Sequence, residues 1–223
     1  MKLLYLFSLI NKYTFPSFED FLANACKGDY QLLVLMQIME QQRTIIELIM
    51  KSKLEVDITR IHFIAPDIND RQAPKQLAGM LKDATGILVL GGNAHFYQKM
   101  YATPEISTLI LEKYNSNIPY AGVSAGAILT IKLGLVKNIA IKPHFSEKKR
   151  FNELIRKMKK NKVTYGFGLD NNISLKIIDN NEIKALGKDS FYLFSRENNN
   201  EYQFKILKNL DGLELLADSS NQL

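Results

Sequence analysis

The chain has 223 residues, of which 46% are apolar and 23% are charged, so its composition excludes a disordered or fibrous protein. One cysteine excludes an intrachain disulfide and a cysteine-rich metal cluster, and three scattered histidines argue against a histidine-based zinc site. The net charge of +6 is modest, and the length suits one domain, which we expect to span residues 1–223.

The first segment, Lys2 followed by an apolar run over 3–10, allows two interpretations. It resembles a short signal peptide, but Asn11 and Lys12 follow at once and no cleavage site with small residues is present. We favour a buried first strand of a parallel sheet, and therefore a cytoplasmic protein. No apolar run is long enough to span a bilayer, so no membrane contact is expected.

Strand-like and helix-like segments alternate through the first 130 residues. The strands are predicted at 3–10, 31–36, 58–64, 86–90 and 118–123, and the helices at 18–25, 40–54, 74–82, 104–114 and 124–133. This alternation is typical of an α/β fold, a mainly parallel sheet with crossover helices on both faces. Short strands at 173–178, 183–186, 191–195 and 202–207 then predict a C-terminal β-meander appended to the sheet.

Residues 122–126 read Gly-Val-Ser-Ala-Gly, which fits the Gly-x-Ser-x-Gly pattern of a nucleophile elbow. In that turn a strand passes abruptly into a helix with Ser124 at the apex, and only small neighbours fit around it. The turn would lift Oγ above the end of the sheet and point the N–H of Ala125 at developing negative charge. The alternative is an ordinary tight turn between a strand and a helix.

A second turn, Gly91-Gly92-Asn93, follows the preceding predicted strand. Glycines let backbone N–H groups approach a ligand closely, so Gly92 N–H would join Ala125 N–H in an oxyanion hole. By itself this turn reads equally as a plain connection from strand to helix.

A serine nucleophile needs a proton acceptor within hydrogen-bond reach, and His144 is the best candidate. It lies twenty residues after Ser124, within Pro-His-Phe. His62 falls inside an apolar strand, where a histidine with structural partners is expected. His95 follows the glycine turn and is expected on the rim of any site.

Residues 142–162 carry nine basic side chains, Arg150 among them, against two acidic ones. Apolar residues recur there at helical spacing, which predicts an amphipathic helix with a basic face. Three interpretations remain: a solvated face, attraction of an acidic substrate, or nucleic-acid binding. Nucleic acid is disfavoured because neither interleaved aromatic residues nor a known binding motif is present.

Three segments together resemble the dipeptidase E and cyanophycinase family of serine peptidases: Gly-Ile-Leu-Val-Leu-Gly-Gly-Asn at 86–93, Ile-Pro-Tyr-Ala-Gly-Val-Ser-Ala-Gly-Ala at 118–127 and Lys-Pro-His-Phe at 142–145. The resemblance extends over about residues 58–187 and includes Gly-Phe-Gly-Leu-Asp at 166–170. It implies a glutamine amidotransferase-like, flavodoxin-like fold with Ser124 where amidotransferases carry cysteine. It also implies hydrolysis of peptide bonds next to aspartate without metal or cofactor.

The sequence departs from this family in the orienting acid. Family members usually carry Asp or Glu between the nucleophile and the histidine, whereas residues 125–143 contain no acid. Asn138 is the obvious polar substitute, in the manner of Cys-His-Asn enzymes, and Asp170 or Glu147 could approach from elsewhere. Leu90 and Ala94 also replace family residues around the glycine turn.

The expected function is that of a serine peptidase acting on small acidic peptides, with Asn93 and Arg150 as candidate substrate contacts. The alternative is a weak or inactive homologue that acts as a binding protein, which the missing acid favours. An ordinary α/β-hydrolase needs an acid and then a histidine after the serine, and the one histidine after Ser124 is His144 with no acid before it. The oligomeric state is left open, a homodimer included.

Overall fold

A computed structural model describes residues 1–67, 69–70, 72–197, 201–208 and 210–214. Its helices are α1 (Phe15–Ala25), α2 (Gln41–Met50), a short 3-10 helix (Ile58–Arg60), α3 (Ala73–Asp83), α4 (Ala94–Tyr101), α5 (Pro104–Asn115), α6 (Ala125–Lys132) and α7 (Phe151–Asn161). Its strands are β1 (Leu3–Phe7), β2 (Leu32–Leu35), β3 (Ile61–Ile64), β4 (Gly86–Val89), β5 (Tyr120–Val123), β6 (Ile139–Pro143), β7 (Tyr165–Leu169), β8 (Ile173–Ile178), β9 (Glu182–Gly187), β10 (Phe191–Arg196), β11 (Tyr202–Leu207) and β12 (Leu210–Glu214). Among the described residues, no helix has both the length and the apolar character that crossing a membrane requires.

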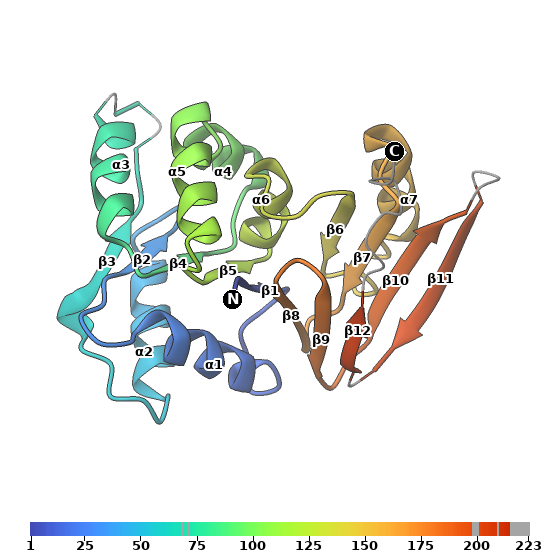
Figure 1. Ribbon diagram of the computed structural model, residues 1–223, viewed down its shortest axis with the longest axis horizontal. Helices are drawn as coiled ribbons and strands as arrows, with labels where there is room; N and C mark the ends of the chain where they lie inside the picture. The colour runs from blue at the N-terminus through green and yellow to red at the C-terminus, as the bar shows by residue number, and fades with distance from the viewer. Residues whose placement is uncertain (68, 71, 198–200, 209, 215–223) are drawn as a thin grey trace.

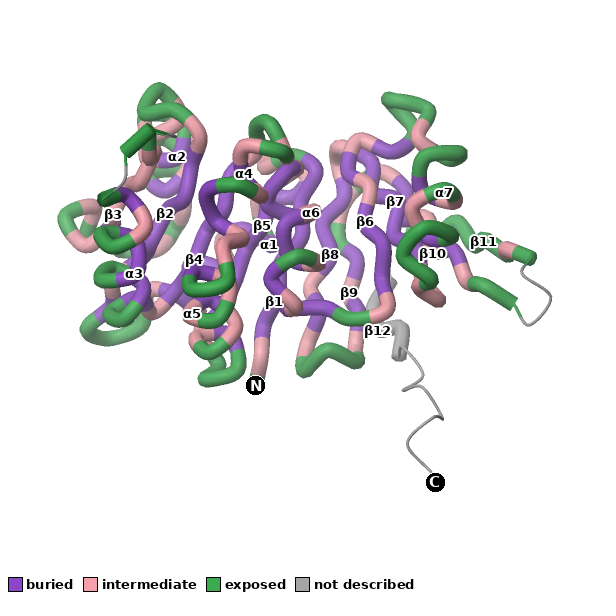
Figure 2. The backbone as a smooth tube through the Cα atoms, turned by 90° about the horizontal axis from the view of Figure 1, so that it is seen from above, coloured by how far each residue is buried: buried purple, intermediate pink, exposed green. Residues whose placement is uncertain are grey.

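The predicted α/β sheet is confirmed. Eight strands form it in the order β12-β9-β8-β1-β5-β4-β2-β3, and the five strands from β1 to β3 run parallel. All residues of β1, β2, β4 and β5 are buried, as expected for parallel strands covered on both faces (Figure 2). The apolar run at the start of the chain therefore forms a central strand.

The helices cover both faces of this sheet, α1 and α2 on one side and α3 to α6 on the other (Figure 1). Side chains that alternate along β1 divide between the two layers. Tyr5 and Phe7 pack with Phe18 of α1, whereas Leu4 and Leu6 belong to the core that contains α3, α4, α5 and α6. Helix α4 was not predicted because its buried face is built largely from tyrosines, which carry a weaker hydrophobic signal.

The expected meander is divided between two sheets, which corrects the sequence prediction. Strands β8 and β9 extend the main sheet antiparallel to β1, but β10 and β11 pair with β7 and β6 in a four-stranded sheet. The reason is that β6 and β7, which the sequence analysis did not identify as strands, offer β10 a free edge. Figure 1 shows this second sheet beside the main one, under α7.

Helix α7 confirms the predicted amphipathic helix in the basic segment. Its apolar residues Leu154 and Met158 are buried against the second sheet. Gly166 of β7 leaves room for the Met158 thioether, which occupies the space that a side chain at residue 166 would take. The connection from β6 through α7 to β7 makes these two strands parallel, and it places His144 directly after β6.

The carboxyl ends of three parallel strands meet at one edge of the main sheet. In the pairing register, Phe7 of β1 lies opposite Val123 of β5, and Gly122 of β5 lies opposite Val89 of β4. Loops that follow parallel strands at such an edge are where α/β proteins place their sites. Ser8, the glycine turn at 91–93 and Ser124 all follow these strands.

Candidate active site

Ser124 lies in a strained turn between β5 and α6, as the elbow pattern predicts. Its backbone has φ of +50° and ψ of −104°, a region that non-glycine residues rarely adopt. The turn is held because Ser124 N–H donates to the carbonyl oxygen of Phe7 at 2.8 Å, and Tyr120 Oη donates to the carbonyl of Gly126 at 3.1 Å. The sheet and the helix thus fix the serine at the apex.

The two glycines of the pattern are required by close packing. A Cβ at Gly122 would lie 2.6 Å from the carbonyl carbon of Gly126, and a Cβ at Gly126 would overlap the carbonyl group of Val89. Gly91 faces the serine, where an added Cβ would lie 3.2 Å from Ser124 Cβ. The start of α6 therefore sits directly on the ends of β4 and β5.

Gly126→Ala is expected to lower the free energy of unfolding by about 1–3 kcal/mol, because backbone atoms of Val89 cannot yield as a flexible side chain would. Chemical denaturation of the purified variant measures this loss. Gly79→Ala is the matched control, since Gly79 also lies within a helix but has open space around it. That variant is expected to be up to about 1 kcal/mol more stable, and equal effects of the two substitutions would contradict the packing argument.

His144 is brought to the serine. Its Nε2 lies 3.0 Å from Ser124 Oγ, within hydrogen-bond reach. The residue has φ of +52° directly after β6, and its N–H donates to Ser8 Oγ at 3.1 Å. Ser8 is fully buried and donates in turn to the carbonyl of Leu169 at 2.8 Å. This hydroxyl therefore ties the histidine to both sheets.

The other ring nitrogen of His144 contacts Asn171. Nδ1 and Asn171 Oδ1 are 2.5 Å apart. An amide oxygen can only accept a hydrogen bond, so Nδ1 must carry the proton. In the neutral ring this leaves the lone pair on Nε2, where it can accept the hydroxyl proton of Ser124. Asn171 thus selects the tautomer that a general base needs.

Asn138, the substitute predicted from sequence, does not take this place. Its side chain donates to Thr164 Oγ1 at 2.9 Å and accepts from Thr164 N–H at 2.7 Å, so it joins the start of β6 to the start of β7. His144 follows the opposite end of β6, a strand length away. The expectation failed because chain order between nucleophile and base does not show which loop meets the imidazole.

Two acids hold the loops around the imidazole, although neither is the partner of the ring. Glu147 Oε1 accepts the N–H of Asn171 at 2.6 Å, and the buried carboxylate of Asp170 accepts the N–H of Ser146 at 2.8 Å. These bonds connect the turn after β6 with the turn between β7 and β8. Sequence reasoning missed Ser8 and Asn171, although each follows a buried strand at the edge where sites form.

The glycine turn is braced by two glutamines that the sequence analysis did not single out. Gln41 Nε2 and Tyr97 Oη donate to the carbonyl of Gly91 at 2.9 and 3.1 Å. Gln37 Oε1 accepts the N–H of Asn93 at 2.7 Å. The side chain of Asn93 caps α4 by accepting from the N–H groups of His95 and Phe96, and a substrate contact by Asn93 stays a prediction.

The turn and the elbow face each other through Gly91, which lies against Ser124. Ala125 is the first residue of α6, where N–H groups have no partner within the helix and the helix dipole favours negative charge. Gly92 is exposed, and a Cβ at this position would meet the side chains of Gln37 and Tyr97. That Gly92 and Ala125 N–H groups hold an oxyanion stays a prediction.

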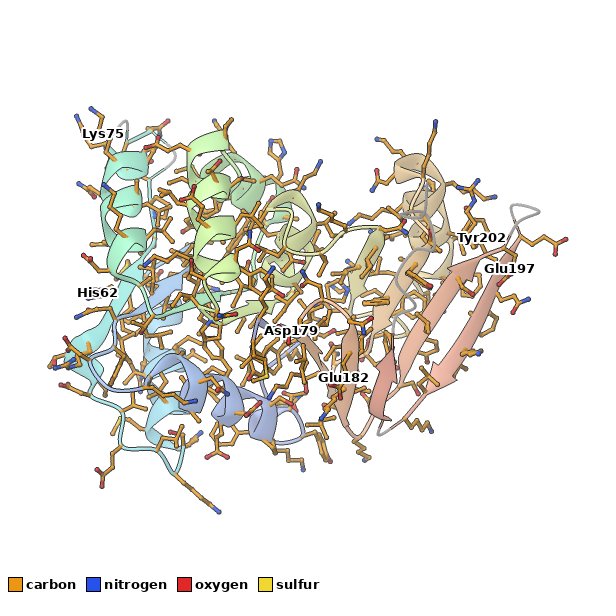
Figure 3. The ribbon with its side chains drawn as sticks, in the orientation of Figure 1. His62, Lys75, Asp179, Glu182, Glu197 and Tyr202 are labelled. Atoms are coloured by element: carbon orange, nitrogen blue, oxygen red, sulfur yellow. The ribbon has the colours of Figure 1, made fainter. Side chains whose placement is uncertain are left out.

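The other two histidines and the cysteine lie away from Ser124. His62 lies on β3, an outer strand of the main sheet (Figure 3), and its ring is hydrogen-bonded to Gln31. His95 is exposed in the first turn of α4. Burial raises the pKa of the Cys26 thiol to about 12, so little reactive thiolate exists near neutral pH. Ser124 is therefore the activated nucleophile candidate.

Basic side chains of residues 142–162 interact with a backbone carbonyl and a carboxylate of the same segment. Arg150 donates to the carbonyl of Pro143 at 2.9 Å, and Lys142 pairs with Glu153 at 2.7 Å. Burial, with repulsion from Lys142 and Lys132, lowers the pKa of Lys157 to about 8. A role for this segment in attracting acidic substrates or nucleic acid stays a prediction. In the described ranges, no three His, Cys, Asp or Glu side chains gather as metal ligands would.

Known proteins resemble this chain in sequence and in fold. Residues 39–138 match the model of peptidase family S51, a segment that contains the glycine turn and Ser124. A comparison with curated proteins gives no significant match. A peptidase from an acI-B1 Actinobacterium has a similar structure, with a TM-score of 0.69 and 13% identity over 96% of this chain and 97% of that chain. A Listeria monocytogenes EGD-e protein, provisionally identified as a peptidase E, gives a TM-score of 0.55 and 18% identity over 93% of this chain and 100% of that one.

Proposed function

We propose that this chain is a serine peptidase with Ser124 as its nucleophile, which the match of residues 39–138 to peptidase family S51 supports. The observation that carries the proposal is the chain of hydrogen bonds from Ser124 Oγ through the His144 ring to Asn171 Oδ1. A serine in a strained elbow, next to a base whose far nitrogen is held, is the arrangement of an activated nucleophile.

In the first step, Ser124 Oγ attacks the carbonyl carbon of the scissile peptide bond while His144 Nε2 takes the hydroxyl proton. The imidazole then carries a proton on each nitrogen, and the proton on Nδ1 stays with Asn171. When the tetrahedral intermediate collapses, Nε2 gives its proton to the leaving amine. Water repeats the sequence on the acyl-enzyme and releases the acid product.

The tetrahedral oxyanion would be held by backbone N–H groups. Ala125 supplies one of them at the N-terminus of α6, and the glycine turn, with Gly92, supplies the other. Gln41 supports this arrangement because it fixes the carbonyl of Gly91, which sets the orientation of the turn. Loss of one oxyanion donor costs about 10²–10³-fold in kcat in enzymes of this kind.

The neutral Asn171 supports a second possibility, a weakly active or inactive homologue that binds peptides. A carboxylate would stabilise the imidazolium, which an amide does less well. Against this, replacing the orienting Asp of a triad by Asn lowers kcat mainly because the histidine then adopts the wrong tautomer. Here the amide oxygen faces Nδ1, so the productive tautomer is kept.

Labelling with a fluorophosphonate tests the proposed function directly, because this reagent reacts only with an activated serine. We expect the label on the tryptic peptide that contains Ser124, identified by mass spectrometry, and we expect heat-denatured protein to remain unlabelled. A native protein without label at Ser124 would contradict the proposal and would favour the binding protein.

A further inference from the structure

A cavity of about 370 Å³ opens beside Ser124. The turn after β1, helix α2 and the ends of β4 and β5 enclose it. The aliphatic side chains that line it are Leu9, Ile10, Ile45, Leu48, Leu90 and Val123. A cavity of about 150 Å³ already holds a benzene ring, so this one is large enough for an aliphatic or aromatic side chain.

Besides Ser124 and His144, the lining contains three polar side chains, Ser8, Gln41 and Thr44, none of which carries a charge. Its polar side chains are mostly engaged already, because Ser8 bonds to the backbone of His144 and Leu169, and the Gln41 amide bonds to Gln37 N–H and Gly91. Thr44, which is exposed on α2, is the remaining polar side chain in the lining. Six aliphatic side chains make up the rest of the wall.

No residue in the described lining is a lysine or an arginine. Arg150, the expected substrate contact, instead donates to the carbonyl of Pro143. A carboxylate that enters this cavity would lose part of its hydration without gaining an opposite charge, which is unfavourable. The expected preference for acidic peptides therefore has no charge partner at the nucleophile.

We propose that this cavity binds the apolar side chain of the residue whose carbonyl Ser124 attacks. The substrates would then be peptides with a neutral aliphatic or aromatic residue at that position, in place of aspartate. The inference rests on the proposed function, and it adds the substrate class. The acyl group stays bonded to Ser124 after the amine leaves, so an apolar wall that borders this serine suits the acyl side.

The test compares p-nitrophenyl esters of N-acetyl leucine, N-acetyl asparagine and N-acetyl aspartate. Leucine and asparagine differ in polarity at similar shape, and asparagine and aspartate differ only in charge. We expect kcat/KM for the leucine ester to exceed that for the asparagine ester by about 10- to 100-fold, which corresponds to burying one apolar side chain. The aspartate ester should be the slowest of the three.

A variant of the cavity tests the comparison between the aspartate and asparagine esters. Thr44→Arg places a cation at the rim of the cavity and is expected to raise kcat/KM for the aspartate ester relative to the asparagine ester by about 10-fold or more. Thr108→Arg is the matched control, because Thr108 is another exposed helical threonine, on α5, that does not line the cavity. This control should leave the ratio unchanged.

The possible outcomes distinguish the apolar substrate class from the serine peptidase function on which it rests. A labelled Ser124 together with equal or faster hydrolysis of the aspartate ester would overturn the apolar substrate class and leave the serine peptidase intact. Absence of both labelling and hydrolysis would overturn the proposed function, and the substrate class with it. Labelling together with the order leucine, asparagine, aspartate supports both.

Discussion

Ser124→Ala is expected to reduce kcat by about 10⁴-fold or more, because the variant lacks the oxygen that would form the acyl-enzyme. The thermal midpoint should stay close to that of the native chain, since the bond from residue 124 N–H to the carbonyl of Phe7 does not depend on the side chain. Alanine is also small enough for the elbow.

Peptide hydrolysis measures the loss of kcat, and a thermal melt of the same preparation measures the thermal midpoint. Ser116→Ala is the matched control, because Ser116 is exposed just after α5 and precedes β5, so it lies at the end of the strand opposite Ser124. It should keep full activity. Residual hydrolysis by Ser124→Ala at the native rate would remove this serine from the mechanism.

Asn171→Ala is expected to lower kcat by about 10²–10⁴-fold with little change in KM, because the imidazole loses the acceptor that fixes its tautomer and its orientation. Asn171→Asp should restore most of this loss, since a carboxylate accepts the same hydrogen bond. The added charge also stabilises the protonated ring, so the acidic limb of the kcat/KM profile should move to higher pH.

Asn138→Gly is the control that tests whether Asn171 or Asn138 orients the His144 ring. Asn138 has φ of +60°, which glycine tolerates, and its side chain bonds to Thr164 far along β6 from His144. We expect a lower free energy of unfolding and an unchanged kcat. If Asn138→Gly lost activity while Asn171→Ala kept it, Asn138 would regain the role predicted from sequence.

Local pattern was sufficient to predict the layered sheet and the serine at the apex of the elbow. Runs such as 86–90 are apolar throughout because parallel strands are covered on both faces, and this signal needs no knowledge of distant contacts. The elbow is partly local, because a Cβ at Gly122 would meet the backbone of Gly126 and Ala127 a few residues along the chain, whereas a Cβ at Gly126 would meet Val89 of the neighbouring strand β4. His144 followed from the chemistry of a serine nucleophile, and the structure places it 3.0 Å from Ser124 Oγ.

The partner of His144 was decided only by the tertiary structure. Asn171 is 27 residues from His144 along the chain, and it reaches the ring because β6 and β7 are parallel neighbours whose ends meet at one edge. No spacing rule connects the two residues. The expectation of Asn138 used sequence order, whereas the pairing register of two strands determines which loop lies beside the imidazole.

The split of the C-terminal strands and the apolar cavity depend on the same long-range geometry. Strands β8 to β11 were recognised as short strands, but pairing with β1 or with β7 depends on which edges are free once α7 has crossed over. The cavity joins Leu9, Ile45 and Val123 from three separate elements. The sequence by itself therefore determined most elements of the main sheet and the candidate nucleophile, whereas the packing of distant strand ends determined which residue contacts the His144 ring and which side chains line the cavity.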